Sequence, residues 1–364
     1  MMGPRITICG PILVFLNFLS VNTSLNIQEN IPLSPLTTLG IGGNARYFVR
    51  AETEAEVADA VRFAAEKGLD LFILGGGSNV LISDRGFGGI VLQIAIKGIE
   101  SAGLLSANLT VGAGEDWDAF VARCAGSDLA GVECLSGIPG YVGGTPVQNV
   151  GAYGQEVSET IVSVRCLDRE TGEFVTFCNA ECGFAYRTSI FNSTRPDKYI
   201  VLNVTYALRP GGEPKVVYKD LLEHFGGQTP SLVEVRDAVL KIRRAKSMVI
   251  DPADPNSKSA GSFFKNPIVE TSKLDEIRCF CERVPYFEFG DKVKIPAAWL
   301  IENAGFSKGF ILGNAGISSN HSLALINRGS ATAAEFIELE ETIQAAVLAK
   351  FGIELLPEPV FVGF

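Results

Sequence analysis

Histidine is scarce in this chain of 364 residues, which contains only His224 and His321. The cysteines include no CxxC pair, so the ligand spacings of zinc and iron–sulfur sites are absent and no metal is expected. We expect the cysteines to be reduced and mostly buried thiols of a cytosolic protein. The eight are Cys9, Cys124, Cys134, Cys166, Cys178, Cys182, Cys279 and Cys281.

An excess of positive charge is also missing, because 31 Lys and Arg residues face 41 Asp and Glu residues, for a formal net charge of −10. A nucleic-acid backbone needs a basic face, so it is excluded as the main partner, although a local basic pocket stays open. The hydrophobic share of 47% and the charged share of 20% are those of an ordinary globular protein. The length suits two or three lobes.

The N-terminal apolar run, RITICGPILVFLNFLS (5–20), is shorter than the roughly 20 residues that a membrane span needs. Its shape fits the core of a signal peptide, but the following SVNTS lacks small residues at the spacing of a cleavage site. The alternative is a non-native extension, with the working protein beginning near Ser24.

Glycine is abundant, with 39 residues that gather in loops, a pattern typical of backbone that approaches a ligand closely. The first concentration, GGGSN (75–79), follows a predicted buried strand at 69–74. A dinucleotide fingerprint would require a third glycine where Val80 stands, and the residues after it favour strands over a helix. The sequence therefore predicts a nest of backbone N–H groups for a pyrophosphate rather than a Rossmann turn.

The second concentration, SGIPGYVGGTPVQNVGAYG (136–154), holds too much glycine and proline for a regular element. Its small polar and amide residues suit a surface that lies flat against a planar ligand. A long structural loop is the alternative, although long ordered loops in compact domains are usually functional.

The pattern of predicted strands and helices changes near residue 227. Before it, short β-rich runs at 159–209 predict a second sheet, and after it helices and strands alternate as in a separate α/β lobe. Helices are predicted at 53–67, 232–246 and 332–351.

One short segment, GSFFKNP (261–267), places Ser262 beside Phe263 and Phe264. The two aromatic residues suggest the walls of a closed, dry pocket. By itself, Ser262 is more simply interpreted as a cap or turn hydroxyl than as a catalytic group.

Seven segments form a collinear set, namely LGGGSNVLISD, SGIPGYVGGTPVQNVGAYGQEV, YRTSIF, SAGSFFKNP, KIPAAWLIENAG, NHSLALINRGSAT and ELLPEPVFVG. In order and approximate spacing, the set resembles the UDP-N-acetylenolpyruvoylglucosamine reductase family of bacterial flavoenzymes. The resemblance runs from about residue 25 to 364. Each motif is weak by itself, but seven in order argue strongly against chance.

The resemblance implies an α+β fold, with a vanillyl-alcohol-oxidase (PCMH-type) FAD-binding domain of two α/β lobes and a C-terminal α/β substrate-binding domain. The expected division is an extension at 1–24, the FAD-binding domain at 25–226 (lobes at roughly 25–100 and 101–226), the substrate-binding domain at 227–352, and a tail at 353–364 that carries a catalytic glutamate.

The resemblance also implies the activity. NADPH reduces FAD, and the reduced flavin converts UDP-N-acetylglucosamine enolpyruvate into UDP-N-acetylmuramate for peptidoglycan synthesis, and so for cell-wall growth and division. The hydride goes to the methylene carbon and a proton to its neighbour, so the site needs a proton donor and a cation beside the substrate carboxylate. By resemblance these are Ser262 as the donor, Arg187 at the carboxylate, and Glu358, which polarises the enolpyruvyl group or orients a water.

Further residues match binding positions of the family. Expected substrate contacts are Tyr186, Tyr218, Lys246, Asn266 and His321. Lys246 matches a lysine that contacts either the diphosphate or the nicotinamide cofactor, and for His321 a purely structural imidazole is an equal alternative. Expected FAD contacts are Gly75, Gly76, Gly77, Ser78, Asn79, Gly137, Gly140, Gly143, Gly144 and Gly151.

The sequence departs from the family at Pro359, where many relatives have a β-branched residue, and in the N-terminal extension. Because the UDP-sugar and NADPH are cytosolic metabolites, we expect a cytoplasmic enzyme without membrane partners. A monomer is the expected oligomeric state. Two other readings stay open: a sugar or lactone oxidase of the same fold, which often attaches its flavin through a His or Cys in the N-terminal lobe, and a non-catalytic flavin- or UDP-sugar-binding descendant. The absence of histidine before His224 argues against the first, and the filled positions Ser262, Arg187 and Glu358 argue against the second.

Overall fold

The computed structural model of the chain describes residues 25–101 and 107–364. The predicted extension at 1–24 and Cys9 lie outside these ranges. Within them, no helix combines the length and the apolar character needed to cross a membrane. Four of the described cysteines are buried, namely Cys124, Cys134, Cys166 and Cys182, whereas Cys178 and Cys279 are exposed.

The first lobe is a four-stranded sheet in the order β1-β2-β5-β3, in which β1 is antiparallel to β2 and the other pairs are parallel. Helix α1 (Glu54–Lys67) joins β2 to β3 and has the predicted Thr53–Glu56 capping box and a left-handed Gly68 at its end. The predicted helix and the strand before the first glycine loop are confirmed. The strands are β1 (Ile27–Pro32), β2 (Asn44–Ala51), β3 (Leu71–Leu74) and β5 (Phe87–Ile94).

The second lobe is a five-stranded antiparallel sheet in the order β12-β11-β13-β7-β6, which confirms the predicted second sheet. Helix α2 (Trp117–Gly126) packs Trp117 and Phe120 against Tyr206. The strands are β6 (Ile99–Ser101), β7 (Asn108–Gly112), β11 (Ile161–Asp168), β12 (Phe174–Cys178) and β13 (Tyr199–Ala207). Shorter pairs are β8 (Leu129–Ala130) with β14 (Arg209–Pro210), and β9 (Gly151–Ala152) with β10 (Gln155–Glu156).

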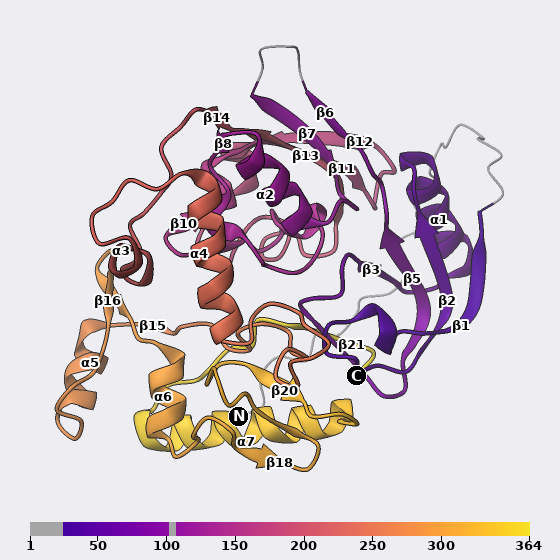
Figure 1. Cartoon of the computed structure of the whole chain (residues 1–364). Helices are drawn as coiled ribbons and strands as arrows, with labels where there is room; N and C mark the ends of the chain where they lie inside the picture. The colour runs from indigo at the N-terminus through magenta and orange to yellow at the C-terminus, as the bar shows by residue number, and fades with distance from the viewer. Residues whose placement is uncertain (1–24, 102–106) are drawn as a thin grey trace.

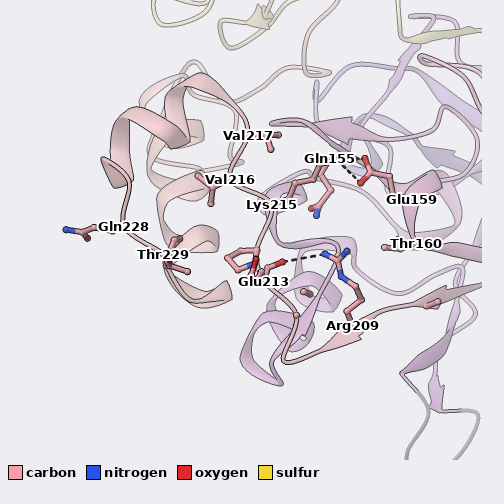
Figure 2. Close-up of a pocket in the computed structure, with 16 residues that line it drawn as sticks. Gln155, Glu159, Thr160, Arg209, Glu213, Lys215, Val216, Val217, Gln228 and Thr229 are labelled. Carbon is pink, nitrogen blue, oxygen red and sulfur yellow. Dashed lines mark hydrogen bonds and ion pairs between the residues drawn. The ribbon is translucent and has the colours of Figure 1, made fainter.

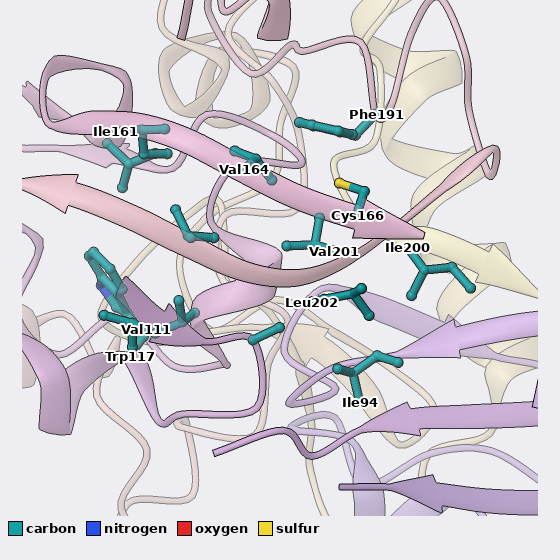
Figure 3. Packing of buried hydrophobic residues seen from close by; sticks show 14 of the residues in the cluster. Ile94, Val111, Trp117, Ile161, Val164, Cys166, Phe191, Ile200, Val201 and Leu202 are labelled. Carbon is teal, nitrogen blue, oxygen red and sulfur yellow. The ribbon is translucent and has the colours of Figure 1, made fainter. Parts of the chain in front are cut away.

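The two lobes share one hydrophobic core, which contains Ile94 from the first sheet and Val164 and Leu202 from the second (Figure 3). The polar atoms of its two largest side chains have partners, because the Tyr206 hydroxyl bonds Thr145 Oγ1 at 2.7 Å and Trp117 Nε1 donates to the Leu135 carbonyl at 3.1 Å. Each fully buried large side chain contributes roughly 1.5–3 kcal/mol. This shared core makes the two lobes a rigid support for the loops that leave them.

Helices α3 (Lys219–Phe225) and α4 (Leu232–Ala245) follow the second lobe. Helix α4 lies beside α2 (Figure 1). Its buried face, with Val235 and Val239, packs against Cys134 of the second lobe. The predicted helix at 232–246 is confirmed. Although α4 lies after residue 227, it packs partly on the FAD-binding side, so the domain boundary there stays a prediction.

The C-terminal region has helices α5 (Thr271–Arg278), α6 (Ala297–Asn303) and α7 (Ala333–Phe351), with two three-stranded antiparallel sheets. The sheets are β15 (Ile268–Val269), β17 (Lys292–Lys294) and β16 (Phe287–Phe289), and β18 (Ile311–Leu312), β19 (Ala315–Ile317) and β20 (Leu325–Asn327). The predicted final helix is confirmed with its buried face, which consists of Phe336, Leu339, Ile343, Val347 and Phe351.

After α7 the chain returns to the first lobe. Strand β21 (Val360–Val362) pairs in parallel with β4 (Val80–Ile82), directly after the first glycine loop. Asp84 strengthens the junction by accepting hydrogen bonds from the N-terminal amides of α7, those of Ala333 at 2.8 Å and Ala334 at 3.1 Å. The tail therefore crosses from the C-terminal region to the FAD-binding region (Figure 1).

Candidate active site

The backbone of Phe263 joins two distant segments beside Ser262. Its N–H donates to the Leu323 carbonyl at 2.8 Å, and its carbonyl accepts from the Glu358 N–H at 2.8 Å. The next residues continue the contact with the tail, since Lys265 N–H donates to the Leu356 carbonyl at 2.9 Å. The segment after Ser262 thus lies between the loop of His321 and the tail that carries Glu358.

Glu358 meets Arg187 in an ion pair, with 3.2 Å between Nε and Oε2. Only 21% of the Arg187 side chain and 11% of the Glu358 side chain are exposed, so water screens the pair weakly. Burial raises the pKa of Glu358, while Arg187 and Lys265 oppose that rise. Arg187 has a left-handed backbone (φ 54°), and its Nη2 donates to the Gly151 carbonyl at 3.0 Å. The arginine therefore links the tail to the second glycine loop.

Ser262 meets His321, with 3.4 Å between Oγ and Nε2. Burial, and then the positive charges of Lys246, Lys308 and Arg243, lower the pKa of His321 to about 4. The imidazole is therefore neutral near pH 7 and can either donate to or accept from the serine hydroxyl. This contact gives His321 a polar role beside a predicted catalytic group.

The expectation that Phe263 and Phe264 form the walls of a pocket is wrong. Their exposed fractions are 0% and 1%, and Phe263 packs against Phe264 and Phe336 in the C-terminal core. In an extended segment successive side chains point to opposite sides, and here the core holds both aromatic rings. They anchor the backbone that carries Ser262 instead of enclosing its hydroxyl.

Tyr186 and Asn266 lie together with a residue that the sequence did not single out, Lys294 of β17. The Asn266 carbonyl oxygen caps α6 by accepting from Ala297 N–H at 2.8 Å, so part of its capacity has a structural use. Lys294 Nζ lies 4.5 Å from the centre of the Tyr186 ring, and burial and then Arg187 lower the pKa of Lys294. In the sequence, the signal that could have identified this lysine is the family motif KIPAAWLIENAG, which begins at Lys294.

Tyr218 and Lys246 form part of a second polar group. Tyr218 meets Tyr153 edge to face, with 5.3 Å between ring centres, and Lys246 Nζ pairs with Asp220 Oδ2 at 2.9 Å. Because Lys246 contributes to the lowered pKa of His321, this group lies within electrostatic reach of Ser262 and His321.

The first glycine loop offers free donors. Among the described residues, the backbone N–H groups of Gly76, Gly77 and Ser78 donate no hydrogen bond to the protein. A Cβ on Gly77 would stand 1.9 Å from the Leu36 carbonyl oxygen, whereas one on Gly75 would meet open space. Unpaired N–H groups beside open space fit the anionic pyrophosphate of FAD.

The second glycine loop is mainly packed against protein. A Cβ on Gly137, Gly140 or Gly143 would meet Leu240, Ser78 or Ala113 at 2.6–2.8 Å, so packing already requires these glycines. Gly144, in contrast, faces open space. Arg243 lies beneath Gly137, and its buried Nε finds no partner in residues 25–101 and 107–364. The rest of the guanidinium is held, since Nη2 donates to the Met248 carbonyl at 2.7 Å, and the free Nε–H beside this loop fits an anionic cofactor.

A pocket of about 920 Å³ contains none of the predicted site residues (Figure 2). Two of its charged side chains already have partners, since Lys215 pairs with Glu159 at 2.7 Å and Arg209 donates to the backbone carbonyl of Glu213 at 3.4 Å. A second pocket, of about 720 Å³, is lined in part by Tyr186, Asn266 and Lys265. Two of these residues adjoin the Arg187–Glu358 pair, because the Arg187 guanidinium lies 5.3 Å from the centre of the Tyr186 ring and Lys265 opposes the rise of the Glu358 pKa. This pocket is therefore the better candidate for part of a substrate path. In the part of the chain that the structure describes, no cluster of His, Cys, Asp and Glu could hold a metal.

Comparison with known proteins now decides the family. The FAD binding domain model matches residues 45–177, and the model of the UDP-N-acetylenolpyruvoylglucosamine reductase C-terminal domain matches residues 252–362. The reductase of that name from Thermobifida fusca is 46% identical over 93% of this chain and 98% of its own length. This chain belongs to the UDP-N-acetylenolpyruvoylglucosamine reductase family.

Other members of the family agree. The reductase from Saccharopolyspora erythraea is 47% identical over 91% of this chain and 94% of its own length. The crystal structure of the Thermus caldophilus reductase covers 93% of this chain and all of its own, with a TM-score of 0.66 and 26% identity. Membership confirms the predicted family, the α+β fold with its FAD-binding domain, the oxidoreductase activity in peptidoglycan precursor synthesis, and the cofactors FAD and NADPH.

Proposed function

We propose that Ser262, Arg187 and Glu358 perform the proton and charge chemistry by which this chain reduces UDP-N-acetylglucosamine enolpyruvate to UDP-N-acetylmuramate. One observation supports this assignment above the others. The backbone of Phe263 is bonded on one side to the loop of His321 and on the other to Glu358, which is itself paired with Arg187. Glu358 and, through it, Arg187 are thereby brought beside the segment that carries Ser262.

FAD, when bound, would supply the hydride chemistry that links NADPH to the methylene carbon of the enolpyruvyl group. The N–H groups of Gly76, Gly77 and Ser78 would hold its pyrophosphate, with Gly75, Gly144 and Gly151 beside it. Arg243 would supply a positive charge from beneath the second glycine loop. Gly137, Gly140, Gly143 and Asn79 would shape the two loops.

Ser262 would give its hydroxyl proton to the carbon next to the one that receives the hydride, and water would return a proton afterwards. The carbon accepts the proton from a weak acid because the intermediate is a strongly basic enolate. Arg187 would hold the substrate carboxylate and offset the charge that develops on it. Glu358, with its raised pKa, would stay paired with Arg187 while it polarises the enolpyruvyl group or orients a water.

Tyr186, Tyr218, Lys246, Asn266 and His321 would contact the nucleotide sugar. Lys246 would bind a phosphate oxygen after giving up part of its bond to Asp220. We propose the domain limits 25–226, 227–352 and 353–364 for the FAD-binding domain, the substrate-binding domain and the tail. A location in the cytoplasm, without membrane partners, is proposed from the cytosolic origin of both small-molecule partners. We also propose that the chain is a monomer.

Two half-reactions test the proposal. In the absence of oxygen, NADPH should bleach the yellow enzyme, and UDP-N-acetylglucosamine enolpyruvate should restore the flavin absorbance with formation of UDP-N-acetylmuramate. Recovery of the absorbance with oxygen but not with the enolpyruvyl sugar would favour an oxidase and refute the proposal.

A further inference from the structure

The side chain of Asn79 connects three parts of the candidate active site. Its Nδ2 donates to the carbonyl of Glu358 at 3.1 Å and to Oε1 of Gln148 at 2.9 Å. Asn79 ends the first glycine loop, Gln148 lies in the second, and Glu358 lies in the tail. The backbone adds a further bond, since the Val360 N–H donates to the Asn79 carbonyl at 3.0 Å.

The orientation of this amide follows from its partners. A backbone carbonyl can only accept, so the nitrogen of Asn79 must face Glu358. An amide nitrogen carries two hydrogens, and here one goes to Glu358 and the other to Gln148. No side-chain donor of Asn79 remains for a phosphate oxygen, so the side chain does not bind the pyrophosphate that the loop is proposed to hold.

These contacts set the position of the Glu358 backbone. Its N–H is bonded to Phe263, beside Ser262, and its carbonyl is bonded to Asn79. The carboxylate of Glu358 then meets Arg187, whose own Nη2 is bonded to Gly151 of the second glycine loop. Without Asn79, one of the two bonds that hold the main chain of Glu358 is lost, and the tail is held to the loops mainly by β21.

We propose that Asn79 is a positioning residue for Glu358, which ties the tail to both glycine loops and fixes the Arg187–Glu358 pair relative to Ser262. The inference rests on the proposed role of Glu358. Loss of Asn79 should therefore slow the step that uses Glu358 and spare the binding of FAD.

The experiment measures both half-reactions by anaerobic stopped flow in the full-length holoenzyme. The variants are Asn79→Ala, Asn79→Asp, Glu358→Gln, the double variant Asn79→Ala/Glu358→Gln, and Gln148→Ala as the matched control. Asn79→Asp keeps the size of the side chain but replaces its donors with acceptors that face two oxygens. Gln148→Ala removes only the loop partner and leaves the bond to Glu358. Flavin content and thermal unfolding report on cofactor binding and folding.

We expect Asn79→Ala and Asn79→Asp to retain FAD and to slow flavin reoxidation by the enolpyruvyl sugar about 10- to 100-fold more than flavin reduction by NADPH, because small misplacements are costly in catalysis. Gln148→Ala should lower reoxidation by less than about threefold. In the Glu358→Gln background, Asn79→Ala should have little further effect on reoxidation, since a residue that acts through Glu358 is not additive with it.

Loss of FAD from both Asn79 variants would overturn the inference in favour of a cofactor-binding side chain. Equal slowing of both half-reactions, or additive effects in the double variant, would overturn it in favour of a general structural role. If Glu358→Gln reoxidises as fast as the parent enzyme, the proposed role of Glu358 fails. If Glu358→Gln is slow but Asn79→Ala is as fast as the parent, only the inference about Asn79 fails.

Discussion

The two polar pairs of the candidate site are held in different ways. Arg187 and Glu358 form a weakly exposed ion pair at 3.2 Å, and the main chain around Glu358 is fixed by Phe263, Asn79 and β21. Ser262 and His321 meet at 3.4 Å, through two neutral groups at the ends of loops. The Arg187–Glu358 pair therefore holds the carboxylate charge in one position. The Ser262–His321 hydrogen bond is long and uncharged, so a bound substrate can replace His321 as the partner of the serine hydroxyl.

The difference suggests separate tasks within one reaction. A buried charged pair is costly to rearrange, because each charge depends on the other for its solvation. A hydroxyl beside a neutral imidazole loses only about 0.5–1.5 kcal/mol when its hydrogen bond is exchanged. We therefore expect the Ser262–His321 pair (the hydroxyl side) to control proton transfer and the Arg187–Glu358 pair (the carboxylate side) to control substrate placement.

The largest effect is expected for Ser262→Ala. Removal of a positioned proton donor should slow flavin reoxidation by about 10²- to 10⁴-fold, while reduction by NADPH changes little. Single-turnover absorbance of the flavin measures both rates, and Ser262→Cys, which keeps a proton on a group of similar size, is the control. Normal reoxidation in Ser262→Ala would assign the proton donor to another group and end the proposed division of tasks.

A smaller effect is expected for Glu358→Gln, which removes the charge and keeps the shape. Reoxidation should fall by about 10- to 1,000-fold, in line with the loss of one oriented polar group in an active site. The stability cost should stay near 1–3 kcal/mol, because Arg187 then faces a neutral amide. Urea unfolding supplies the stability, and an unchanged reoxidation rate would contradict the role of the carboxylate side.

The anchoring of the tail can be tested at Val360, whose N–H bonds to Asn79 and whose side chain is 53% exposed. Val360→Pro removes this N–H and should slow reoxidation about tenfold by loosening Glu358. Val360→Ala keeps the bond and should behave like the parent. Equal rates for the two variants would show that β21 does not position Glu358.

The smallest effect concerns pH and His321. Its pKa is about 4 in the folded protein against roughly 6.5 in the unfolded chain, so between these values the unfolded state binds more protons. Stability should therefore decrease as the pH falls from 6.5 to 4, by about 1.4 kcal/mol for each unit of pKa difference.

The variant His321→Gln should flatten this decrease and change reoxidation at pH 7.5 by only a few-fold, because glutamine can still bond Ser262. Urea unfolding at pH 4.5, 5.5 and 7.5 provides the measurement. A pH dependence equal to that of the parent would show that the imidazole is not the group that titrates.

Local patterns predicted much of the fold. Thr53 with Glu56, and the apolar stripe from Phe336 to Phe351, specify helices through contacts within a few turns, so those helices are visible in the sequence. The glycine content of the two loops was equally visible. The sequence could not show which glycines face a ligand, because Gly76 and Gly140 are required by the approach of one loop to the other.

The error at Phe263 and Phe264 has a similar origin. Two adjacent aromatic residues specify burial, but the sequence does not say whether they face a ligand cavity or the hydrophobic core. The core of α7 and α6 decided that question. Lys294 was missed because a lysine on a short strand is ordinarily solvated, and only the folded chain places it over Tyr186.

The sequence by itself determined the helices with their caps, the two glycine loops and the motif set of the family, because each depends on neighbouring residues or on their order. The tertiary structure decided which of those motifs meet. Parallel pairing of β21 with β4, and the hydrogen bonds of Phe263 and Asn79, bring Glu358 from the end of the chain to Ser262 and Arg187. Such contacts join residues whose separation along the chain leaves no local signal, and only the folded main chain can make them.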